Sequence, residues 1–381
     1  MVPFANVRVL VDYRPALRAR TGIGEYVHEL TRALAGAPPP GSTVTAFSSS
    51  WRDRVEETLG RDAPGVRVLD RRVPVRALTW AWHRLGWPPV EAFAGDIDVA
   101  HSPTPLLVPA RRAAQVVTVF DLHFLAGPDE DADPVRRDFV ALARRHVTRA
   151  DHVIAGSAYA ARLVATTLGV PPARVTATPL GAPAWAAGVR TARGSAPGRT
   201  LLVIGTVEPR KNLGLVLDAY ARLLERRADV PPLVVAGRVA AGGAAWAERA
   251  ARPPLSGHVT MMGYVDDATR RRLYADARAV LVPSVDEGFG LPALEAMACG
   301  VPVVVSPAGA LPEVVGGAGL VAPLDAPAAW ADAIEGLLDE GRAAALGERG
   351  IARSADFSWA TAAAATWNAY RLAVAARAER P

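Results

Sequence analysis

Two short apolar runs, AVLVP at 279–283 and VPVVV at 301–305, are separated by a glycine-containing loop and a helical segment. Pro292 stands where the first turn of a helix tolerates proline, and Gly300 followed by Pro302 marks the end of that helix. Short runs rich in β-branched residues are typical of buried parallel strands. A strand, a helix and a second strand in this order constrain this part of the chain to an α/β fold.

The same alternation of apolar runs and helical periodicity extends along the chain. We predict further strands at 6–12, 42–47, 66–69, 99–101, 115–120, 152–155, 201–205, 233–237 and 259–263. The segment 183–199 is dense in Gly, Pro and Ala and lacks periodicity, which indicates a linker. At 381 residues the chain is long enough for two cores. We therefore expect two doubly wound, Rossmann-like domains, residues 1–182 and 200–357, that face each other across a cleft.

The segment 358–381 is too apolar for a free tail because Trp359, Trp367, Tyr370 and Val374 recur at helical spacing. It predicts a packed C-terminal helix.

Composition excludes several classes of function. The net charge of +5 is modest and the arginines are scattered, so we expect no nucleic-acid partner. No apolar run reaches the length of a membrane span, and the N-terminus has no features of a signal peptide, so we expect a cytoplasmic protein. Cys299 is the single cysteine, which excludes an intrachain disulfide and indicates packing, with a reactive thiol as the alternative. The seven histidines show no metal-binding spacing, so we expect no metal.

The segment 71–87, RRVPVRALTWAWHRLGW, mixes arginines with three tryptophans. Leu78, Trp82 and Leu85 fall on one helical face, which favours packing into a core. Peripheral contact with the anionic inner face of a membrane stays as the alternative.

The loop between 279–283 and the following helix has features of a phosphate site. Gly288 and Gly290 allow close approach of backbone to a ligand, and N–H groups at a helix start attract anions. Glu287 and Glu295 flank this loop and are brought toward the same crevice, although a solvated loop residue and an ordinary helix former are the alternatives. The two carboxylates could hold a sugar and a ribose.

The loop after 201–205 carries Arg210 and Lys211 just before a helical segment. Cations at a helix start oppose the helix dipole, which disfavours a purely structural role and favours a bound diphosphate. Lys211 is the single lysine among the 43 basic residues. A compact ammonium is therefore retained at this position in a chain that otherwise uses guanidinium.

The first half of the chain offers two further groups of candidates. Thr21, Gly22 and Gly24 form a loop that opens a helix after the first strand, which indicates either a tight turn or a phosphate-binding loop. Polar residues also end two strands, where ligands bind in open α/β sheets. These residues are His101, Ser102, Asp121 and His123. A buried, hydrogen-bonded histidine is the competing interpretation for His101 and for His123.

The stretch EGFGLPALE at 287–295 resembles the Glu-x7-Glu signature of retaining family 4 glycosyltransferases, and residues inside the spacing match as well. The TGIG loop and the segments HSP and HDL are also similar to the family. The resemblance implies a GT-B fold with the acceptor bound mainly by the first domain and a nucleotide-diphosphate sugar mainly by the second. It also implies a C-terminal helix that crosses back to the first domain, transfer with retention of configuration, and no cofactor or metal.

The resemblance assigns roles by position. Arg210, Lys211 and the Gly288–Leu291 backbone would hold the diphosphate, Glu287 the sugar and Glu295 the ribose. Donor-side contacts are further implied for Gly22, Gly24, Arg238, Val265, Gly288, Phe289, Gly290 and Leu291. Acceptor-side contacts are implied for Thr21, His101, Ser102, Asp121 and His123. The candidate catalytic residues are Glu287, Lys211, Arg210, Asp121 and His123.

This chain departs from the family at Phe120, where a histidine that contacts the donor sugar is usual. We interpret this as a sign of a less polar donor such as a deoxysugar. If the strand persists past this position, His123 lies on the same face as the missing histidine and is a possible substitute.

The donor base, whether GDP-, UDP- or dTDP-linked, and the acceptor, whether a glycan, a lipid-linked or a small molecule, stay open, as does the oligomeric state. A nucleotide-sugar epimerase and a noncatalytic sugar-nucleotide-binding module fit the same skeleton.

Overall fold

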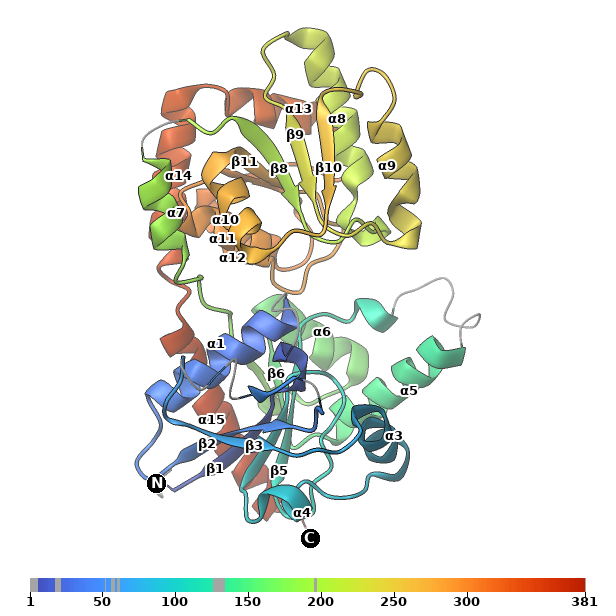
Figure 1. Ribbon diagram of the computed structural model, residues 1–381, viewed down its shortest axis with the longest axis vertical. Coiled ribbons are helices and arrows are strands. Elements are labelled where there is room, and N and C mark those ends of the chain that lie inside the picture. Colours follow the sequence, from blue (N-terminus) through green and yellow to red (C-terminus); the bar gives the residue numbers. More distant parts are fainter. Residues whose placement is uncertain are drawn as a thin grey trace. The chain divides into compact units, whose positions relative to one another are not determined.

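A computed structural model describes residues 6–17, 22–51, 53–55, 59, 62–125, 134–194 and 197–380. The chain divides into two compact units (Figure 1). Unit 1 comprises Met1–Gly181 together with Ser358–Pro381, and unit 2 comprises Ala182–Phe357. Among the described residues, no helix combines the length and apolar character needed to cross a membrane.

The described part of unit 1 contains a parallel seven-stranded sheet in the order β3-β2-β1-β4-β5-β6-β7. The strands are β1 Arg8–Asp12, β2 Thr43–Ser48, β3 Val66–Asp70, β4 Val99–Ser102, β5 Ala114–Val119, β6 His152–Ala155 and β7 Val175–Ala177. The central strands are buried on both faces, which is why they read as continuous apolar runs. The order reverses direction between β1 and β4, which is the switch point of a Rossmann-like sheet.

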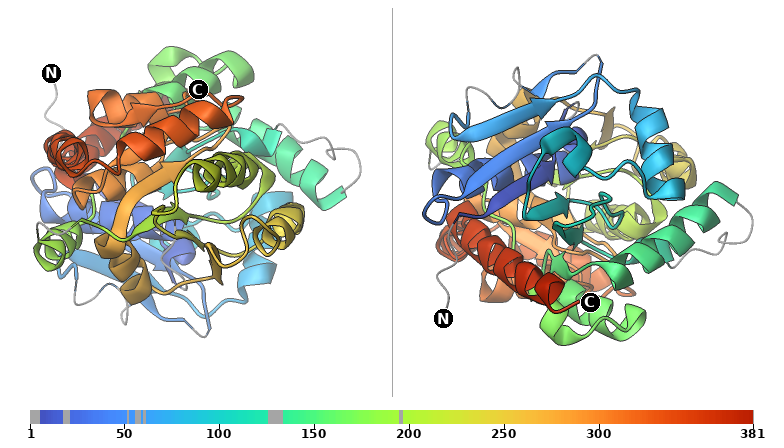
Figure 2. Two further views of the ribbon diagram at one scale, coloured as in Figure 1. Left: turned by 90° about the horizontal axis from the view of Figure 1, so that it is seen from above. Right: turned by 90° about the horizontal axis from the view of Figure 1, so that it is seen from below.

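Helices cover both faces of this sheet. They are α1 Ile23–Gly36, α3 Val75–Leu85, α4 Glu91–Ala94, α5 Pro134–Arg149, α6 Ala158–Leu168 and α15 Trp359–Ala378, with single turns at Arg14–Ala16, His123–Leu125 and Pro172–Arg174. Helices α1 and α15 pack against each other, and the view from below in Figure 2 shows α15 in red beside the strands. Leu78 and Trp82 of α3 join one core cluster with Leu10 and Phe47, and α5 and α6 contribute to a second cluster with β5 and β6.

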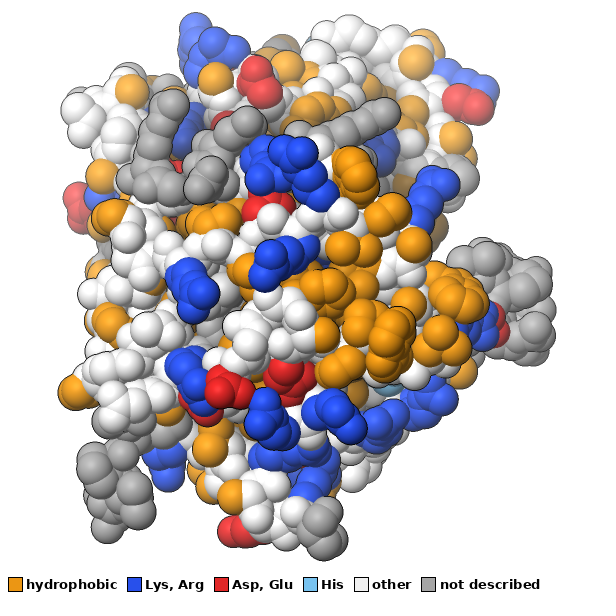
Figure 3. Space-filling view, turned by 60° about the horizontal axis from the view of Figure 1, so that its bottom comes forward, with side chains coloured by type: hydrophobic (Ala, Val, Ile, Leu, Met, Phe, Trp, Pro, Cys, Tyr) orange, Lys and Arg blue, Asp and Glu red, His pale blue; other side chains and the backbone are white. Residues whose placement is uncertain are grey.

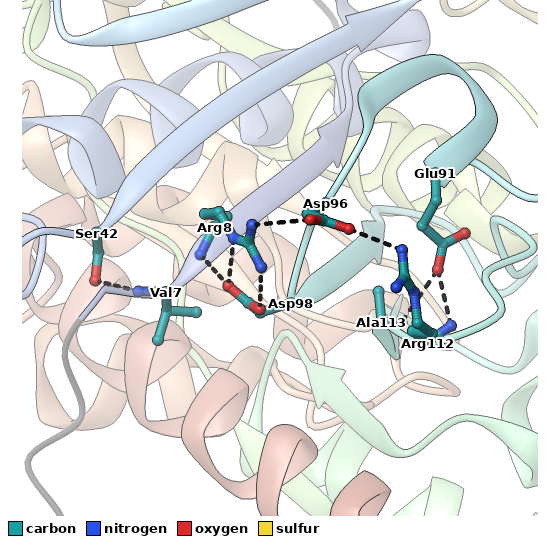
Figure 4. A network of polar contacts seen from close by, with 8 residues as sticks. All are labelled: Val7, Arg8, Ser42, Glu91, Asp96, Asp98, Arg112 and Ala113. Carbon is teal, nitrogen blue, oxygen red and sulfur yellow. Dashed lines mark hydrogen bonds and ion pairs between the residues drawn. The ribbon is translucent and has the colours of Figure 1, made fainter.

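The amino ends of the unit 1 strands are held by a network of ion pairs and hydrogen bonds (Figure 4). The guanidinium of Arg8 on β1 donates to Asp98, which precedes β4, with an Nη2–Oδ1 distance of 2.9 Å. Asp96 accepts from Arg112 at 2.7 Å, and Glu91 accepts from three consecutive backbone N–H groups at 111–113. These charged residues tie strands to loops at the edge of the sheet opposite the carboxyl ends, so they have a structural explanation.

Unit 2 repeats the arrangement with a parallel sheet in the order β10-β9-β8-β11-β12-β13 in its described residues. Its strands are β8 Thr200–Ile204, β9 Leu233–Ala236, β10 Val259–Gly263, β11 Ala277–Val282, β12 Val303–Val305 and β13 Leu320–Val321. Its helices are α7 Ala186–Arg193, α8 Leu213–Arg226, α9 Ala244–Ala250, α10 Asp267–Asp276, α11 Leu291–Ala298, α12 Leu311–Val315, α13 Pro327–Gly336 and α14 Glu340–Ser354. Helices α8 and α13 share one core cluster with the strands. The prediction of two Rossmann-like sheets is confirmed.

The segment 183–199, which the sequence predicted to be a linker without regular structure, contains a helix in the structure. This helix is α7, whose Arg193 donates to the backbone carbonyls of Ala275 and Ala277 and whose Arg190 donates to that of Ala298. These long side chains, together with the buried Ala186 and Val189, attach the helix to the rest of unit 2. The segment is therefore part of unit 2, and the chain passes between units just before it, after Gly181.

The predicted C-terminal helix is α15, and it groups with unit 1 as expected. Trp359, Trp367 and Tyr370 are buried. Gly181 lies so close to Trp359 that a Cβ on it would come within 2.5 Å of the ring and the backbone nitrogen. The two points at which the chain passes between units therefore lie side by side in unit 1.

Candidate functional site

The switch point of the unit 2 sheet lies between β8 and β11, which pair directly. The loop after β8 places Arg210 and Lys211 on a single turn, Pro209–Lys211, and the loop after β11 carries Ser284 and Glu287. Carboxyl ends of parallel strands at such a point are where ligands bind in open α/β sheets. The structure thus brings together the two loops that the sequence singled out separately.

Glu287 is the centre of this cluster, and its side chain is buried. One carboxylate oxygen accepts from Lys211 Nζ at 2.5 Å and from Ser284 Oγ at 2.7 Å. The other accepts from the Arg210 guanidinium at 3.3 Å, and the same Arg210 nitrogen donates to the Asp286 carbonyl at 2.9 Å. Arg210 also pairs with Glu208 at 3.0 Å. The two cations are therefore matched by two carboxylates.

The pKa of Glu287 is lowered from its ordinary value. Burial by itself raises this pKa, but the charges of Lys211 and Arg210, with the hydrogen bonds from Lys211 and Ser284, more than offset burial. Glu287 is therefore an anion at neutral pH. The sequence argument about Arg210 and Lys211 did not foresee this partner, which gives both cations a structural role in addition to any role in binding.

The glycine-rich loop that follows is compact and buried. Gly290 has a φ of +104° at the start of α11, and a Cβ there would lie 2.7 Å from the side chain of Leu311, so only glycine fits. Gly288 and Phe289 are buried, and Leu291 is half-buried at the first position of α11. N–H groups in the first turn of a helix lack acceptors within the helix. Together these features form a loop and helix start suited to an anion.

Glu295 lies one turn into α11 and belongs to a different network. Its buried carboxylate accepts from Tyr274 Oη at 2.6 Å and from the guanidinium of Arg270, both on α10. The Arg270 guanidinium also stacks over the ring of Trp185 at 5.2 Å. In the described residues, the hydrogen bonds of Glu287 and those of Glu295 go to different partners. These hydrogen bonds do not support the expectation that both carboxylates line one crevice.

The remaining donor-side candidates of unit 2 lie at neighbouring strand ends. The Val207 N–H donates to the Arg238 carbonyl, and the Gly237 N–H donates to the Gly263 carbonyl, which links the loops after β8, β9 and β10. The Arg238 side chain is exposed, and Val265 follows β10 and is half-buried. Both residues therefore lie on the same edge of the sheet as Lys211.

In unit 1, the predicted TGIG loop is described only in part. Thr21 lies outside the described residues. Gly22 is exposed at the start of α1 with a φ of +52°, and Gly24 is buried in the first turn. Glycine is required at position 22 by its backbone conformation, which fits the tight turn and leaves the phosphate-binding alternative as a prediction.

His101 is fully buried on β4, and both of its ring nitrogens are hydrogen-bonded. Nδ1 lies 2.8 Å from Tyr370 Oη of α15, and Nε2 lies 2.8 Å from Thr118 Oγ1 of β5. Burial lowers the pKa of His101 to about 3, so the ring is neutral. This geometry favours the structural alternative, and the acceptor-side role predicted for His101 does not fit because no ring nitrogen faces an open space.

The other unit 1 candidates lie at the ends of β4 and β5. Ser102 is buried and its hydroxyl lies 3.1 Å from Thr104 Oγ1. Asp121 is half-buried and accepts from the His123 backbone N–H at 3.2 Å. Because β5 ends at Val119 and His123 lies in the turn His123–Leu125, the strand does not persist. His123 therefore does not share a strand face with position 120, and residues three apart would point to opposite faces even on a continuous strand, so that expectation is wrong.

Phe120 packs edge-on against Tyr26 with ring centroids 4.7 Å apart. A Cβ on Gly156 would lie 2.7 Å from the Phe120 ring, so a small residue is needed beneath it. Phe120 is half-buried. An aromatic contact with Tyr26 therefore occupies the position where the family usually has a histidine.

Sequence reasoning missed several residues of these sites. Ser284 and Glu208 complete the environment of Glu287 and Arg210. In unit 1, Asp12 ends β1 beside the switch point and pairs with the half-buried Arg14 at 2.7 Å. Each of these residues ends a predicted strand or follows one within a few positions, and that position is the signal by which they could have been found.

The described residues contain no group of three or more His, Cys, Asp or Glu side chains placed to hold a metal ion. Cys299 is buried, and the pKa of its thiol is raised to about 12, mainly by this burial. A buried thiol with a raised pKa fits the packing role expected for Cys299.

Comparison with known families gives one match in each half of the chain. Residues 20–184 match the family described as Glycosyltransferase Family 4, and residues 198–340 match the family described as Glycosyl transferases group 1. The two matches cover most of both units.

Two curated relatives are mannosyltransferases. O-antigen chain mannosyltransferase B of Escherichia coli is 45% identical over 175 residues, which cover 45% of each chain. MMP alpha-(1->4)-mannosyltransferase of Mycolicibacterium hassiacum is 34% identical over 414 residues, which cover 96% of this chain and 98% of the relative. The matches to the first three relatives span only 45% to 59% of those proteins' lengths.

Among solved structures, sucrose-phosphate synthase from Thermosynechococcus elongatus shares the fold, with a TM-score of 0.70 at 21% identity over 96% of this chain and 98% of that one. The family matches, the nearly full-length relative and the doubled Rossmann-like sheets agree on one conclusion. The chain belongs to the group 1, family 4 glycosyltransferases, with the GT-B fold.

Proposed function

We propose that this protein transfers a mannosyl residue from GDP-mannose to a hydroxyl group of a glycan, a lipid-linked or a small-molecule acceptor, with retention of configuration and without a metal ion. The cluster of Arg210, Lys211, Ser284 and Glu287 at the switch point of unit 2 is the observation that carries the proposal. Mannose is favoured over other sugars because both relatives described above are mannosyltransferases.

The chemistry requires stabilisation of the leaving group. When the bond between the sugar C1 and the diphosphate oxygen breaks, negative charge accumulates on the nucleoside diphosphate. Arg210, Lys211 and the backbone N–H groups of Gly288–Leu291 would neutralise this charge from fixed positions. A metal ion would then be unnecessary for that purpose.

Binding of a diphosphate would change the partners of the two cations. Glu287 pairs with both of them, so they are already partly desolvated and oriented by the protein itself. We infer that an incoming diphosphate takes over part of the Lys211 and Arg210 hydrogen bonds and releases one Glu287 oxygen toward the sugar hydroxyls. Pre-organisation of this kind lowers the cost of ordering the site in the transition state.

In the bond-forming step, the acceptor oxygen attacks C1 on the face that the diphosphate leaves, and the acceptor proton passes to the departing diphosphate oxygen. Asp121 and His123 of unit 1 stay as candidate acceptor-side groups. Glu295 stays the candidate for the ribose hydroxyls, which would require it to share its carboxylate with Arg270 and Tyr274.

Transfer assays test the proposal directly. The full-length protein is incubated in EDTA with GDP-mannose, UDP-glucose or a dTDP-deoxysugar and a panel of hydroxyl acceptors, and released nucleoside diphosphate and the anomeric configuration of the product are measured. We expect release of GDP and an α-linked product. Preference for the deoxysugar would instead support the interpretation of Phe120, and conversion of donor to an epimer without acceptor would contradict transfer.

A matched pair of variants tests the cluster. Lys211→Ala should lower kcat/KM by a factor on the order of 100 or more, as expected when a donor to developing charge is removed. Arg199→Ala removes a largely exposed cation that pairs with Asp276 at the surface of the same unit, and it should leave the rate unchanged. Near-normal transfer by Lys211→Ala would refute the role of the cluster.

A further inference from the structure

The loop that precedes α11 holds one aromatic ring between two glycines, in the order Gly288, Phe289, Gly290. Glycine has more backbone freedom than any other residue, so a segment of this kind is ordered largely by contacts from outside it. The Phe289 ring is the one side chain that this tripeptide offers for such a contact. What holds this ring therefore influences where the N–H groups of the loop point.

Phe289 is buried, and its ring packs edge-on against the ring of Phe357, with centroids 5.9 Å apart and planes inclined at 79°. In this arrangement the positive edge of one ring meets the negative face of the other, which gives the pair a preferred direction as well as apolar contact. Phe357 is also buried and is the last residue of unit 2. The loop is thus anchored by a side chain that lies far from it in the sequence.

Arg353, near the end of α14, fixes the position of Phe357. The centre of its guanidinium lies 4.9 Å from the centre of the Phe357 ring, where a cation is attracted to the aromatic face. The same guanidinium donates to the carbonyls of Glu313 and Val314 in α12, at 2.7 Å and 3.1 Å, and pairs with Asp356 at 2.9 Å. Carbonyls at the end of a helix lack donors within the helix, so Arg353 satisfies them and joins Phe357 to α12.

Helix α12 supports the same loop at two further points. A Cβ on Gly290 would lie 2.7 Å from the side chain of Leu311, the first residue of α12, and the Ala310 N–H donates to the Glu287 carbonyl at 2.8 Å. The loop, α12 and Phe357 therefore form one connected frame. Within this frame, the contact from Phe357 acts on the residue between the two glycines.

The backbone of Phe357 is fixed in addition to its ring. Its N–H donates to the Ser354 carbonyl at 3.1 Å, and its carbonyl accepts from the N–H of Ala182, the first residue of unit 2, at 2.9 Å. A residue that is held at both backbone groups and at its ring moves only if these contacts break. Phe357 is therefore suited to hold another group in position.

We propose that Phe357 is a positioning residue for sugar transfer: its ring fixes Phe289 and thereby aims the N–H groups of Gly288–Leu291 at the departing diphosphate. The proposal rests on the function proposed above, in which these N–H groups neutralise the charge that develops on the nucleoside diphosphate. Donors stabilise that charge most when they are oriented before it develops. Loss of the ring contact should therefore affect kcat more than the KM for the donor.

Transfer kinetics test this proposal. Phe357→Leu and Phe289→Leu each keep an apolar side chain and remove one ring of the pair. Each should lower kcat at least about tenfold and raise the donor KM no more than about threefold, with kcat expressed per GDP-binding site counted by calorimetry. The double variant should lower kcat no further than the more damaging single variant, because both changes break the same contact.

Hydrogen exchange provides a readout that requires no donor. In Phe357→Leu the amides of residues 287–291 should exchange at least about fivefold faster than in the wild type, because local order is lost there. Amides of the central strands β8 and β11 should keep their wild-type rates. A general loss of stability would instead raise exchange in the strands as well.

Two variants in unit 1 serve as matched controls. Phe93→Leu breaks a ring contact with Phe47 whose centroid distance is also 5.9 Å. Trp80→Leu removes a ring of α3 that is 59% exposed, on the side of unit 1 where Figure 3 shows hydrophobic side chains gathered at the surface. Both should keep kcat and the exchange rates of the loop at wild-type values. Thermal melting of every variant establishes that it is folded.

The exposure of α3 also corrects a prediction from the sequence. Leu78 and Trp82 point into the core, where the Trp82 ring packs on Phe47 at 5.6 Å, but Leu85 is 60% exposed. The sequence placed Leu85 on the same buried face, and that expectation is wrong. Trp80 and Leu85 both face solvent, which is why Trp80 suits a control.

Three results would overturn the proposal. The first is normal kcat per site in Phe357→Leu, and the second is a double variant in which the two single effects multiply. The third is unchanged exchange at residues 287–291. Normal transfer by Phe357→Leu together with loss of transfer in Lys211→Ala would remove the positioning role and leave the proposed function standing.

Discussion

Glu287 illustrates how a carboxylate can prepare a site for an anion. It is buried, its pKa is lowered by the two cations that it contacts, and it holds those cations in place. Its negative charge also competes with a diphosphate for the same cations. Glu287 therefore keeps the side chains of Arg210 and Lys211 ordered but lowers the affinity of the site for a diphosphate. These two effects can be separated by experiment.

Glu287→Gln should separate them. Without the carboxylate, Lys211 loses its counter-charge and Arg210 keeps only that of Glu208, so the protein should lose about 2 kcal/mol of unfolding free energy, measured by urea denaturation. GDP should bind at least as tightly as to the wild type, measured by calorimetry, because the cations are free to contact the phosphates.

In the same variant kcat should fall on the order of 100-fold if Glu287 orients the sugar. Weaker GDP binding together with normal kcat would contradict this division between ground-state and transition-state effects. The control is Glu208→Gln, which removes the carboxylate on the other side of Arg210 and should change kcat far less.

At the residue scale, the sequence predicted which loops carry the clustered charged side chains better than it predicted the partners of those side chains. Position relative to strand ends singled out Arg210, Lys211 and Glu287, because the direction of parallel strands fixes the edge at which loops meet. The partners Ser284 and Tyr274 depend on distances between loops and helices, which periodicity does not encode. His101 was ambiguous for the same reason, since its second partner, Tyr370, is far away in the sequence.

At the element scale, α15 is joined to the unit 1 sheet by a buried chain of hydrogen bonds. Tyr370 of α15 contacts His101 of β4, which contacts Thr118 of β5, which in turn contacts Tyr26 of α1 at 3.1 Å. Four elements are thus connected through polar atoms inside an apolar core. Such networks specify one packing arrangement because each broken link leaves a buried polar atom without a partner.

Tyr370→Phe tests this connection. The change keeps the ring and removes the hydroxyl that contacts His101 Nδ1, so the unfolding free energy should fall by about 1–2 kcal/mol. Tyr264→Phe removes an exposed hydroxyl in unit 2 and serves as the control. Urea denaturation followed by tryptophan fluorescence measures both, and equal stability of the two variants would show that the network contributes nothing.

The elements that the sequence did not predict share a physical property. Strand β7 is half-buried at one edge of its sheet, and β13 has two residues, so neither has the continuous apolar run of a central strand. Helix α7 is short, buries Ala186 and Val189, and is attached as well by arginines that donate to backbone carbonyls. The predicted central strands were correct because burial on both faces leaves an unmistakable pattern.

At the scale of the whole molecule, buried histidines are concentrated in unit 1. Burial lowers the pKa of His101 to about 3, and burial together with nearby positive groups lowers the pKa of His146 and of His152 to about 4. In the unfolded chain these groups take up a proton near pH 6.5. The folded protein therefore binds fewer protons than the unfolded chain below that pH, and stability falls as the pH falls.

Unit 1 should accordingly be acid-sensitive. Between pH 6.5 and pH 5 each such histidine should cost up to about 2 kcal/mol, whereas carboxylates with a lowered pKa, such as Glu287, lose their contribution only below about pH 4.5. Hydrogen exchange at pH 7 and pH 5, corrected for intrinsic rates, should show loss of protection in β4, β5 and β6 before β8 and β11. Equal loss in both sheets would contradict the prediction.

The placement of α15 has a consequence for biosynthesis. Unit 2 is one continuous stretch of chain, but unit 1 is completed by a helix that the ribosome makes only after all of unit 2. The sheet of unit 1 must wait, with the surface that α15 covers open to solvent, while the later unit is translated and folds. The second half of the chain can thus reach its native state before the first, which reverses the usual order in which successive domains mature.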